Sequence, residues 1–106
     1  MAVKDITSLL SDVKNYLDIT WDDYETERKL RGIIRRGISY LDEKAGKNLE
    51  YLEGSKEKGL LLDYARYARE SALDEFEHDY LHELLALQIG QQLKGGADDE
   101  QGTTNL

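Results

Sequence analysis

The sequence predicts an all-α protein, a small bundle of about four helices with a long second helix and a flexible C-terminal tail. The chain contains no proline, the residue that interrupts helices most strongly. Good helix formers fill most of its segments, and apolar side chains recur at intervals of three and four residues, as they do along one face of a helix. These observations indicate helices through most of the first 94 residues.

The first helix is predicted over residues 5–17, where one stripe is apolar: Ile6, Leu9, Leu10, Val13 and Leu17. The acidic junction after it interrupts this spacing and offers Thr20, Asp22 or Asp23 as the N-cap of the next helix. Trp21 lies beside these residues, and we expect it to pack as a hydrophobic staple and not to stack on a ligand.

The long second helix is predicted over residues 22–44. One arc of it is apolar and should be buried: Leu30, Ile33, Ile34, Ile38 and Leu41. Gly46 is expected to cap its C-terminus. In the connection over residues 47–58, we expect Leu49, Tyr51 and Leu52 to pack against the bundle.

A third helix is predicted from about Ser55 to Leu73, and the side chains of its contact face become small, mostly alanine, toward its C-terminal half. A fourth is predicted to begin near Asp79, and the pattern leaves open whether residues 76–79 form a turn or continue a helix. After Leu93 the composition becomes polar and rich in glycine. We therefore expect one helical domain over residues 1–94 and a disordered acidic tail over residues 95–106, which has too little apolar surface to offset the entropy of ordering.

Composition narrows the function. The formal net charge of -8 favours solubility and disfavours general binding to nucleic acid, because the phosphate backbone is repelled. The absence of cysteine excludes disulfides and thiol chemistry. No apolar stretch approaches the roughly 20 residues that cross a bilayer, so we expect a soluble, cytoplasmic protein without membrane contact.

The two histidines form the one candidate metal site in the sequence. His78 and His82 are four residues apart, and Glu75 precedes His78 by three, which is half of the pattern in di-iron helical bundles. The second half is missing, and Asp79 stands where a zinc peptidase needs glutamate. We therefore predict no metal site and no cofactor.

Other catalytic patterns are also missing. The serines lie outside any nucleophile elbow, and the glycines match no phosphate-binding loop. We therefore predict that the chain is not an enzyme.

A basic segment stands out in this acidic chain, because five cations fall within nine residues: Arg28, Lys29, Arg31, Arg35 and Arg36. This segment fits a solvated helix face paired with nearby glutamates, a subunit contact that meets an acidic surface, or a direct DNA contact. Tyr40 and Tyr67 lie near helix edges, where tyrosine suits either the rim of an interface or the edge of a core. The candidate interface residues are Arg28, Arg31, Arg35, Arg36, Tyr40 and Tyr67.

Four segments, in their order along the chain, resemble the small head-tail connector (head completion or adaptor) proteins of tailed bacteriophages and prophages. They are ITSLLSDVKNYLDI from Ile6, the acidic junction TWDD, the helix KLRGIIRRGISYLDEKAG, and the block LLLDYARYARESALDEFEHDYLHELLALQ. The resemblance covers residues 5 to about 90 and includes no catalytic motif.

This resemblance implies a helical bundle whose copies assemble into a ring, usually of twelve, on the portal protein. Such a ring extends the DNA channel toward the tail or a stopper protein, and DNA passes through it without specific binding. The subunit would be a monomer in the host cytoplasm and would take its place at the head-tail junction of the virion. From the residues alone two alternatives stay open: a small helical regulator or inhibitor of one partner protein, and a metal-binding enzyme using Glu75, His78 and His82.

Overall fold

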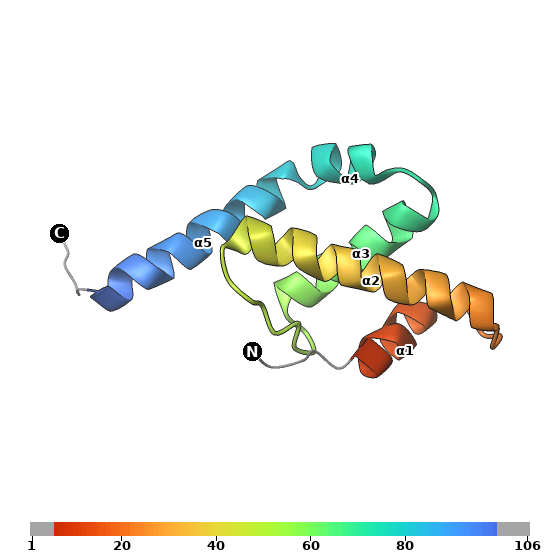
Figure 1. Cartoon of the computed structure of the whole chain (residues 1–106). Coiled ribbons are helices and arrows are strands. Elements are labelled where there is room, and N and C mark those ends of the chain that lie inside the picture. Colours follow the sequence, from red (N-terminus) through yellow and green to blue (C-terminus); the bar gives the residue numbers. More distant parts are fainter. Residues whose placement is uncertain (1–5, 100–106) are drawn as a thin grey trace.

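The computed structural model describes the backbone of residues 6–99 and the side chains of residues 6–90. These described residues form five helices joined by loops and contain no strand: α1 (Ile6–Tyr16), α2 (Tyr24–Ala45), α3 (Lys56–Arg69), α4 (Leu73–Asp79) and α5 (Leu81–Asp99) (Figure 1). The all-α class is confirmed, with one helix more than expected. The radius of gyration, 15.6 Å, exceeds the about 13 Å of a compact domain of this length, so the molecule is elongated.

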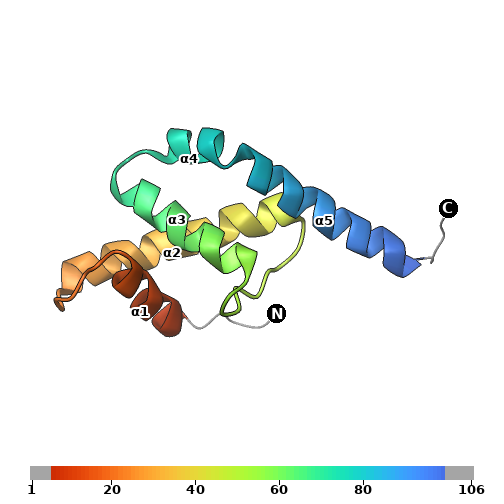
Figure 2. The ribbon, with the colours of Figure 1, turned by 180° about the vertical axis from the view of Figure 1, so that it is seen from behind.

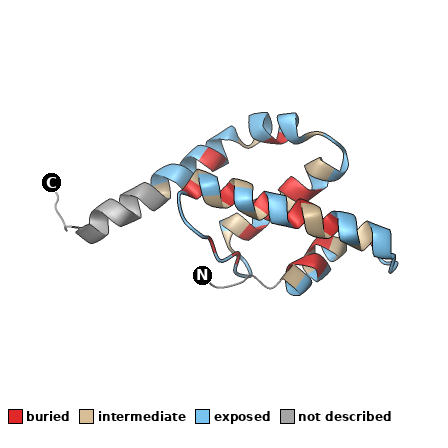
Figure 3. Cartoon of the chain, viewed as in Figure 1, coloured by how far each residue is buried: buried red, intermediate tan, exposed pale blue. Residues whose placement is uncertain are grey.

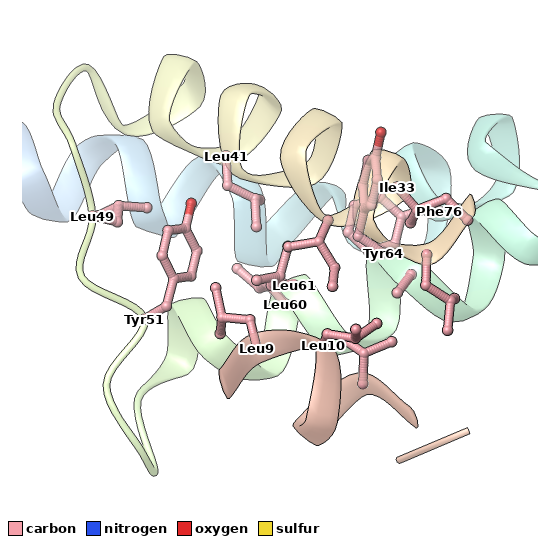
Figure 4. Close-up of a cluster of buried hydrophobic side chains, with 14 of the residues drawn as sticks. Leu9, Leu10, Ile33, Leu41, Leu49, Tyr51, Leu60, Leu61, Tyr64 and Phe76 are labelled. Atoms are coloured by element: carbon pink, nitrogen blue, oxygen red, sulfur yellow. The ribbon is translucent and has the colours of Figure 1, made fainter. Parts of the chain in front are cut away.

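Helix α2 is the central helix of the bundle. It contacts α1, α3 and α5, and seen from behind it still lies along α3, with α1 beneath one end of the pair (Figure 2). The buried positions of α2 alternate with exposed ones, as expected of an amphipathic helix (Figure 3). The most deeply buried side chains come from four helices and form one core, part of which Figure 4 shows: Val13, Leu30, Ile34, Leu41, Leu61 and Phe76.

The ends of α2 are fixed by the caps that the sequence offered. The Asp23 carboxylate accepts hydrogen bonds from the backbone N–H of Thr26 at 2.9 Å and from its hydroxyl at 2.7 Å. These bonds hold the pKa of Asp23 below its usual value. At the other end Gly46, with φ 76°, donates its N–H to the carbonyl groups of Asp42 and Glu43. The predicted C-cap is therefore confirmed, and Asp23 is the N-cap among the three candidates.

Trp21 does not form the expected staple. Its side chain is 51% exposed, and it stands two residues before the Asp23 cap, whereas a staple residue directly precedes the cap. Ile19, which is 4% exposed, is the residue of this junction that packs into the core.

The connection between α2 and α3 packs on the bundle through Leu49 and Tyr51. The Asp42 carboxylate accepts a hydrogen bond from the Leu49 N–H at 3.0 Å and from the Tyr51 hydroxyl at 2.8 Å, and both side chains are buried. The expectation for Leu52 was wrong, because this residue is 62% exposed and precedes the turn at Gly54, which has φ 81°.

A break at Tyr80 separates α4 from α5, which answers the question that the sequence left open. The buried Phe76 ring stacks on Tyr80 at 4.7 Å between ring centroids, and α5 then takes a new direction in which Leu84 is buried. The fourth predicted helix therefore begins at Leu81 and is preceded by a helix that was not predicted.

Helix α5 extends away from the bundle in both views (Figures 1 and 2). It runs to Asp99 and so includes the first five residues of the predicted tail, while residues 100–106 lie outside the described part of the chain. Among the described helices none combines the length and the apolar character needed to cross a membrane.

Candidate functional site

A basic groove lies between the N-terminal half of α2 and the C-terminal end of α3. Its volume is about 550 Å³, and its floor includes Leu30, Ile33 and Ala68. Among the described residues, four cationic side chains and no acidic one line it: Arg28, Lys29, Arg36 and Arg69. In a chain with 22 acidic and 14 basic residues, this arrangement makes the groove a local positive field.

Most cations of the basic groove have no ion-pair partner among the described residues. Arg28 lies 3.8 Å from Glu25, and both side chains are well exposed, so water screens this pair. No carboxylate of the described residues lies within ion-pair distance of Lys29, Arg36 or Arg69. A Cβ atom on Gly32 would lie 3.3 Å from Arg36 Nη1, so the absence of a side chain there leaves room for the Arg36 guanidinium.

Arg31 and Arg35 do not line the basic groove. Arg31 lies 3.7 Å from Glu27, and Glu27 also accepts a hydrogen bond from Lys14 of α1 at 2.8 Å. That bond and a second one to Asp22 raise the pKa of Lys14. Of the four predicted arginines, the structure therefore brings together Arg28 and Arg36, assigns Arg31 to the contact between α1 and α2, and leaves Arg35 exposed elsewhere on α2.

Tyr40 and Tyr67 belong to an aromatic cluster that joins α2, α3 and α4. Their rings lie 6.3 and 5.6 Å from Phe76, both in edge-on contact, and both side chains are half-buried. Tyr64 and Tyr80 complete the cluster. Edge-to-face contacts of this kind stabilise a core, so in the single chain the two predicted rim residues serve packing.

Two hydroxyl groups of this cluster, those of Tyr40 and Tyr67, bind acidic residues of α4. Tyr40 donates to Glu77 at 2.8 Å, and Tyr67 donates to Asp79 at 3.1 Å. Burial and these bonds raise the pKa of both tyrosines, and burial raises the pKa of Tyr80 to about 12. The neutral hydroxyl groups therefore hold the short helix α4 against the bundle.

The two histidines line different cavities. His78 lines a hollow of about 470 Å³ with Lys44 and Glu77, whereas His82 lines a groove of about 740 Å³ between α3 and α5. Because the helix breaks at Tyr80, the two histidines of the candidate metal site lie on different helices, His78 on α4 and His82 on α5. No group of three or more potential metal ligands forms in the part of the chain that the structure describes.

A stripe of exposed apolar side chains runs along the start of α5. Leu81, Leu85 and Ile89 are spaced four residues apart, so they share one side of the helix, and each is between 43 and 52% exposed. We call these three residues the α5 stripe. Exposed apolar area of this kind is typical of a surface that a partner covers.

Two residues of the basic groove were not among the predicted interface residues. Lys29 was recognised as part of the basic segment but was not chosen as a candidate interface residue. Arg69 lies 33 residues beyond Arg36 and reaches the groove only because α3 packs along α2. The segment YARYAR, in which Arg69 lies, does not indicate that Arg69 is close to the arginines of α2.

Comparison of the chain with protein-family models, with curated proteins and with solved structures finds no match.

Proposed function

We propose that this chain is a structural head-tail connector that docks as an oligomeric ring on a phage portal protein and extends the DNA channel toward the tail. The observation that carries the proposal is a pair of uncovered surfaces, the basic groove and the α5 stripe. They lie on different helices and differ in chemistry. A ring of identical subunits needs two different patches, because one patch on each copy meets the other patch on the next.

The sequence resemblance supports the same proposal. The helices of the described chain occur in the order of the segments that resemble connectors: a short helix, an acidic junction, a long helix and an aromatic-rich helix. The last segment corresponds to most of α3, all of α4 and the first part of α5. The ring would usually hold twelve copies, and the free subunit would be a monomer.

The net charge of -8 suits a protein that surrounds a DNA path. Repulsion between an acidic ring and the phosphate backbone favours sliding over sticking, so DNA would pass without specific contacts. In this proposal the partners are the portal protein, neighbouring copies, and a tail or stopper protein. The protein would act at the head-tail junction of the virion, after a period in the host cytoplasm.

The alternative is a small helical regulator that binds one partner protein through the same surfaces. The basic groove and the α5 stripe would suit a single acidic and apolar partner as well as they suit a ring. Copy number separates the two proposals, because a regulator binds in one or two copies and a connector binds in many.

Sedimentation velocity of the full chain with the portal protein of the same phage or prophage tests the proposal. We expect the chain to sediment as a monomer alone and to move with the portal ring in a complex of many subunits. A chain that never moves with the portal would contradict the connector function. A complex with one copy of the chain would favour the regulator.

A further inference from the structure

The basic groove and the end of α5 lie at opposite ends of the molecule. The groove is built on residues 26–36 of α2 and on the end of α3. In Figures 1 and 2 the N-terminal end of α2 and the end of α5 are the two extremes of the elongated chain. The longest dimension of the molecule is 54 Å, so the end of a chain's own α5 is far from its own groove.

The sequence at the end of α5 is acidic, so its negative charge complements the positive charge of the basic groove. Asp98 and Asp99 are the last two residues of α5, and Glu100 follows them. The last turn of the helix has no basic residue. Acidic residues at the C-terminal end of a helix are unfavourable, because the helix dipole is negative there, and a cationic neighbour relieves this repulsion.

We propose that the acidic segment of residues 98–100 of one copy binds in the basic groove of a second copy. Arg36, Arg69 and Lys29 would pair with its carboxylates, since no described carboxylate of their own chain lies within ion-pair distance. Bonds between guanidinium and carboxylate groups are among the stronger polar contacts in proteins. The contact is head to tail, so repeating it produces a ring or a filament.

This contact rests on the proposed connector function, because it names how neighbouring subunits of the ring meet. A nucleic-acid phosphate is the competing occupant of the groove. The net charge of -8 disfavours DNA at long range, whereas the acidic segment of a second copy belongs to the same assembly.

Cysteine crosslinking of two full-length variants tests the proposal without portal protein, so its outcome is separate from that of the connector function. The chain has no cysteine of its own. One variant is Ala68→Cys, which places a thiol in the groove, and the other is Gln101→Cys, which follows the acidic segment. The control for the groove is Ser39→Cys, an exposed position on the C-terminal half of α2.

We expect the Ala68→Cys and Gln101→Cys proteins to form a disulfide-linked heterodimer about tenfold faster than the Ser39→Cys and Gln101→Cys pair. High salt should remove this difference, because the attraction is electrostatic. Equal rates for the two pairs at low salt would overturn the proposal.

Exchanging the charges of the groove and of the acidic segment distinguishes a loss of ion pairing from a loss of folding. Adding Arg36→Glu and Arg69→Glu to the Ala68→Cys protein should abolish its faster crosslinking to the Gln101→Cys protein. Adding Asp98→Lys and Asp99→Lys to the Gln101→Cys protein should then restore the faster crosslinking. Arg35→Glu in the Ala68→Cys protein changes an exposed neighbour outside the groove and should leave the crosslinking rate unchanged. Failure of the exchange to restore crosslinking would overturn the proposal. Binding of a labelled DNA duplex that Arg36→Glu abolishes, with no preferred crosslink, would overturn it in favour of nucleic acid.

Discussion

Gly37 of α2 faces Leu61 of α3 so closely that a Cβ atom at position 37 would lie 2.7 Å from Leu61 Cδ1. The same atom would lie 2.9 Å from Cδ1 of Tyr64. The hydrogen atom of this glycine therefore sets the distance between the two helices that form the centre of the core. The sequence predicted small alanines on the contact face of α3, but the glycine that permits the close approach lies on α2.

Gly37→Ala should destabilise the fold by about 1–2 kcal/mol. Overpacking a core costs about 1–3 kcal/mol, and the better helix propensity of alanine returns up to about 1 kcal/mol. Urea denaturation followed by circular dichroism measures the change.

The matched control is Gly59→Ala on α3. A Cβ atom there meets nothing within 4 Å. This substitution should stabilise the protein by about 0.5–1 kcal/mol, because alanine is the better helix former. Equal effects of the two substitutions would mean that Gly37 does not set the helix spacing.

Lys58 ties α3 to α1 and to the connection before α3. It is the one charged residue buried among the described side chains, and its ammonium group donates to Asp12 at 2.5 Å and to Glu53 at 2.8 Å. These two carboxylates raise the pKa of Lys58 and keep it charged. Lys58→Met keeps the apolar stem and should cost about 1 kcal/mol, because both carboxylates are partly or fully exposed and water screens the pairs.

Lys56→Met is the control for Lys58. Lys56 begins α3 two residues earlier and is exposed. Its substitution should change the free energy of unfolding by less than about 0.5 kcal/mol. If Lys58→Met and Lys56→Met change the free energy of unfolding equally, the ion pairs of Lys58 do not hold α1 in place.

Stability should fall as the pH rises above about 10, the ordinary tyrosine pKa. Burial and then the bond to Asp42 raise the pKa of Tyr51, and burial and then the bond to Glu77 raise that of Tyr40. The folded chain keeps these protons while the unfolded chain loses them, so the contribution is complete below pH 10 and is lost above it.

Thermal melts across alkaline pH, with tyrosinate absorbance in the near ultraviolet, check this expectation. Tyr51→Phe should weaken the pH dependence. Tyr24→Phe, at a residue 72% exposed, should leave it unchanged. Release of the Tyr51 proton before any unfolding would contradict the account.

Zinc should bind no more tightly to the native chain than to the His78→Ala variant. The two histidines line separate cavities, and no group of three or more potential metal ligands forms among the described residues. Isothermal titration of both proteins measures this, with His82→Ala as the companion variant. Tight binding that either substitution abolishes would revive the metal-dependent alternative.

Most of the fold follows from local signals in the sequence. The spacing of Leu30, Ile33, Ile34 and Leu41 predicts the buried face of α2, and its N-cap and C-cap lie where residue type alone suggests. The break at Tyr80 was not predictable in the same way. Phe76 and Tyr80 are four residues apart and stack on each other, but both rings also contact Tyr67 of α3, and no spacing within the segment indicates this contact between helices.

The candidate site was only partly predictable, because helical spacing describes one helix at a time. The arginines of α2 are visible as a basic segment, but spacing groups Arg28, Arg31 and Arg35, whereas packing groups Arg28 and Arg36 with Arg69. Tyr40 and Tyr67 were equally compatible with an interface and a core edge. Their bonds to Glu77 and Asp79 come from a helix that the sequence did not predict.

Native mass spectrometry of the full chain with the portal protein of the same phage or prophage, recorded with and without zinc or iron, tests the central claim most directly. We predict a monomer alone and, with the portal, a species that carries many copies of the chain and is indifferent to metal. A metal-bound monomer that ignores the portal would contradict the account.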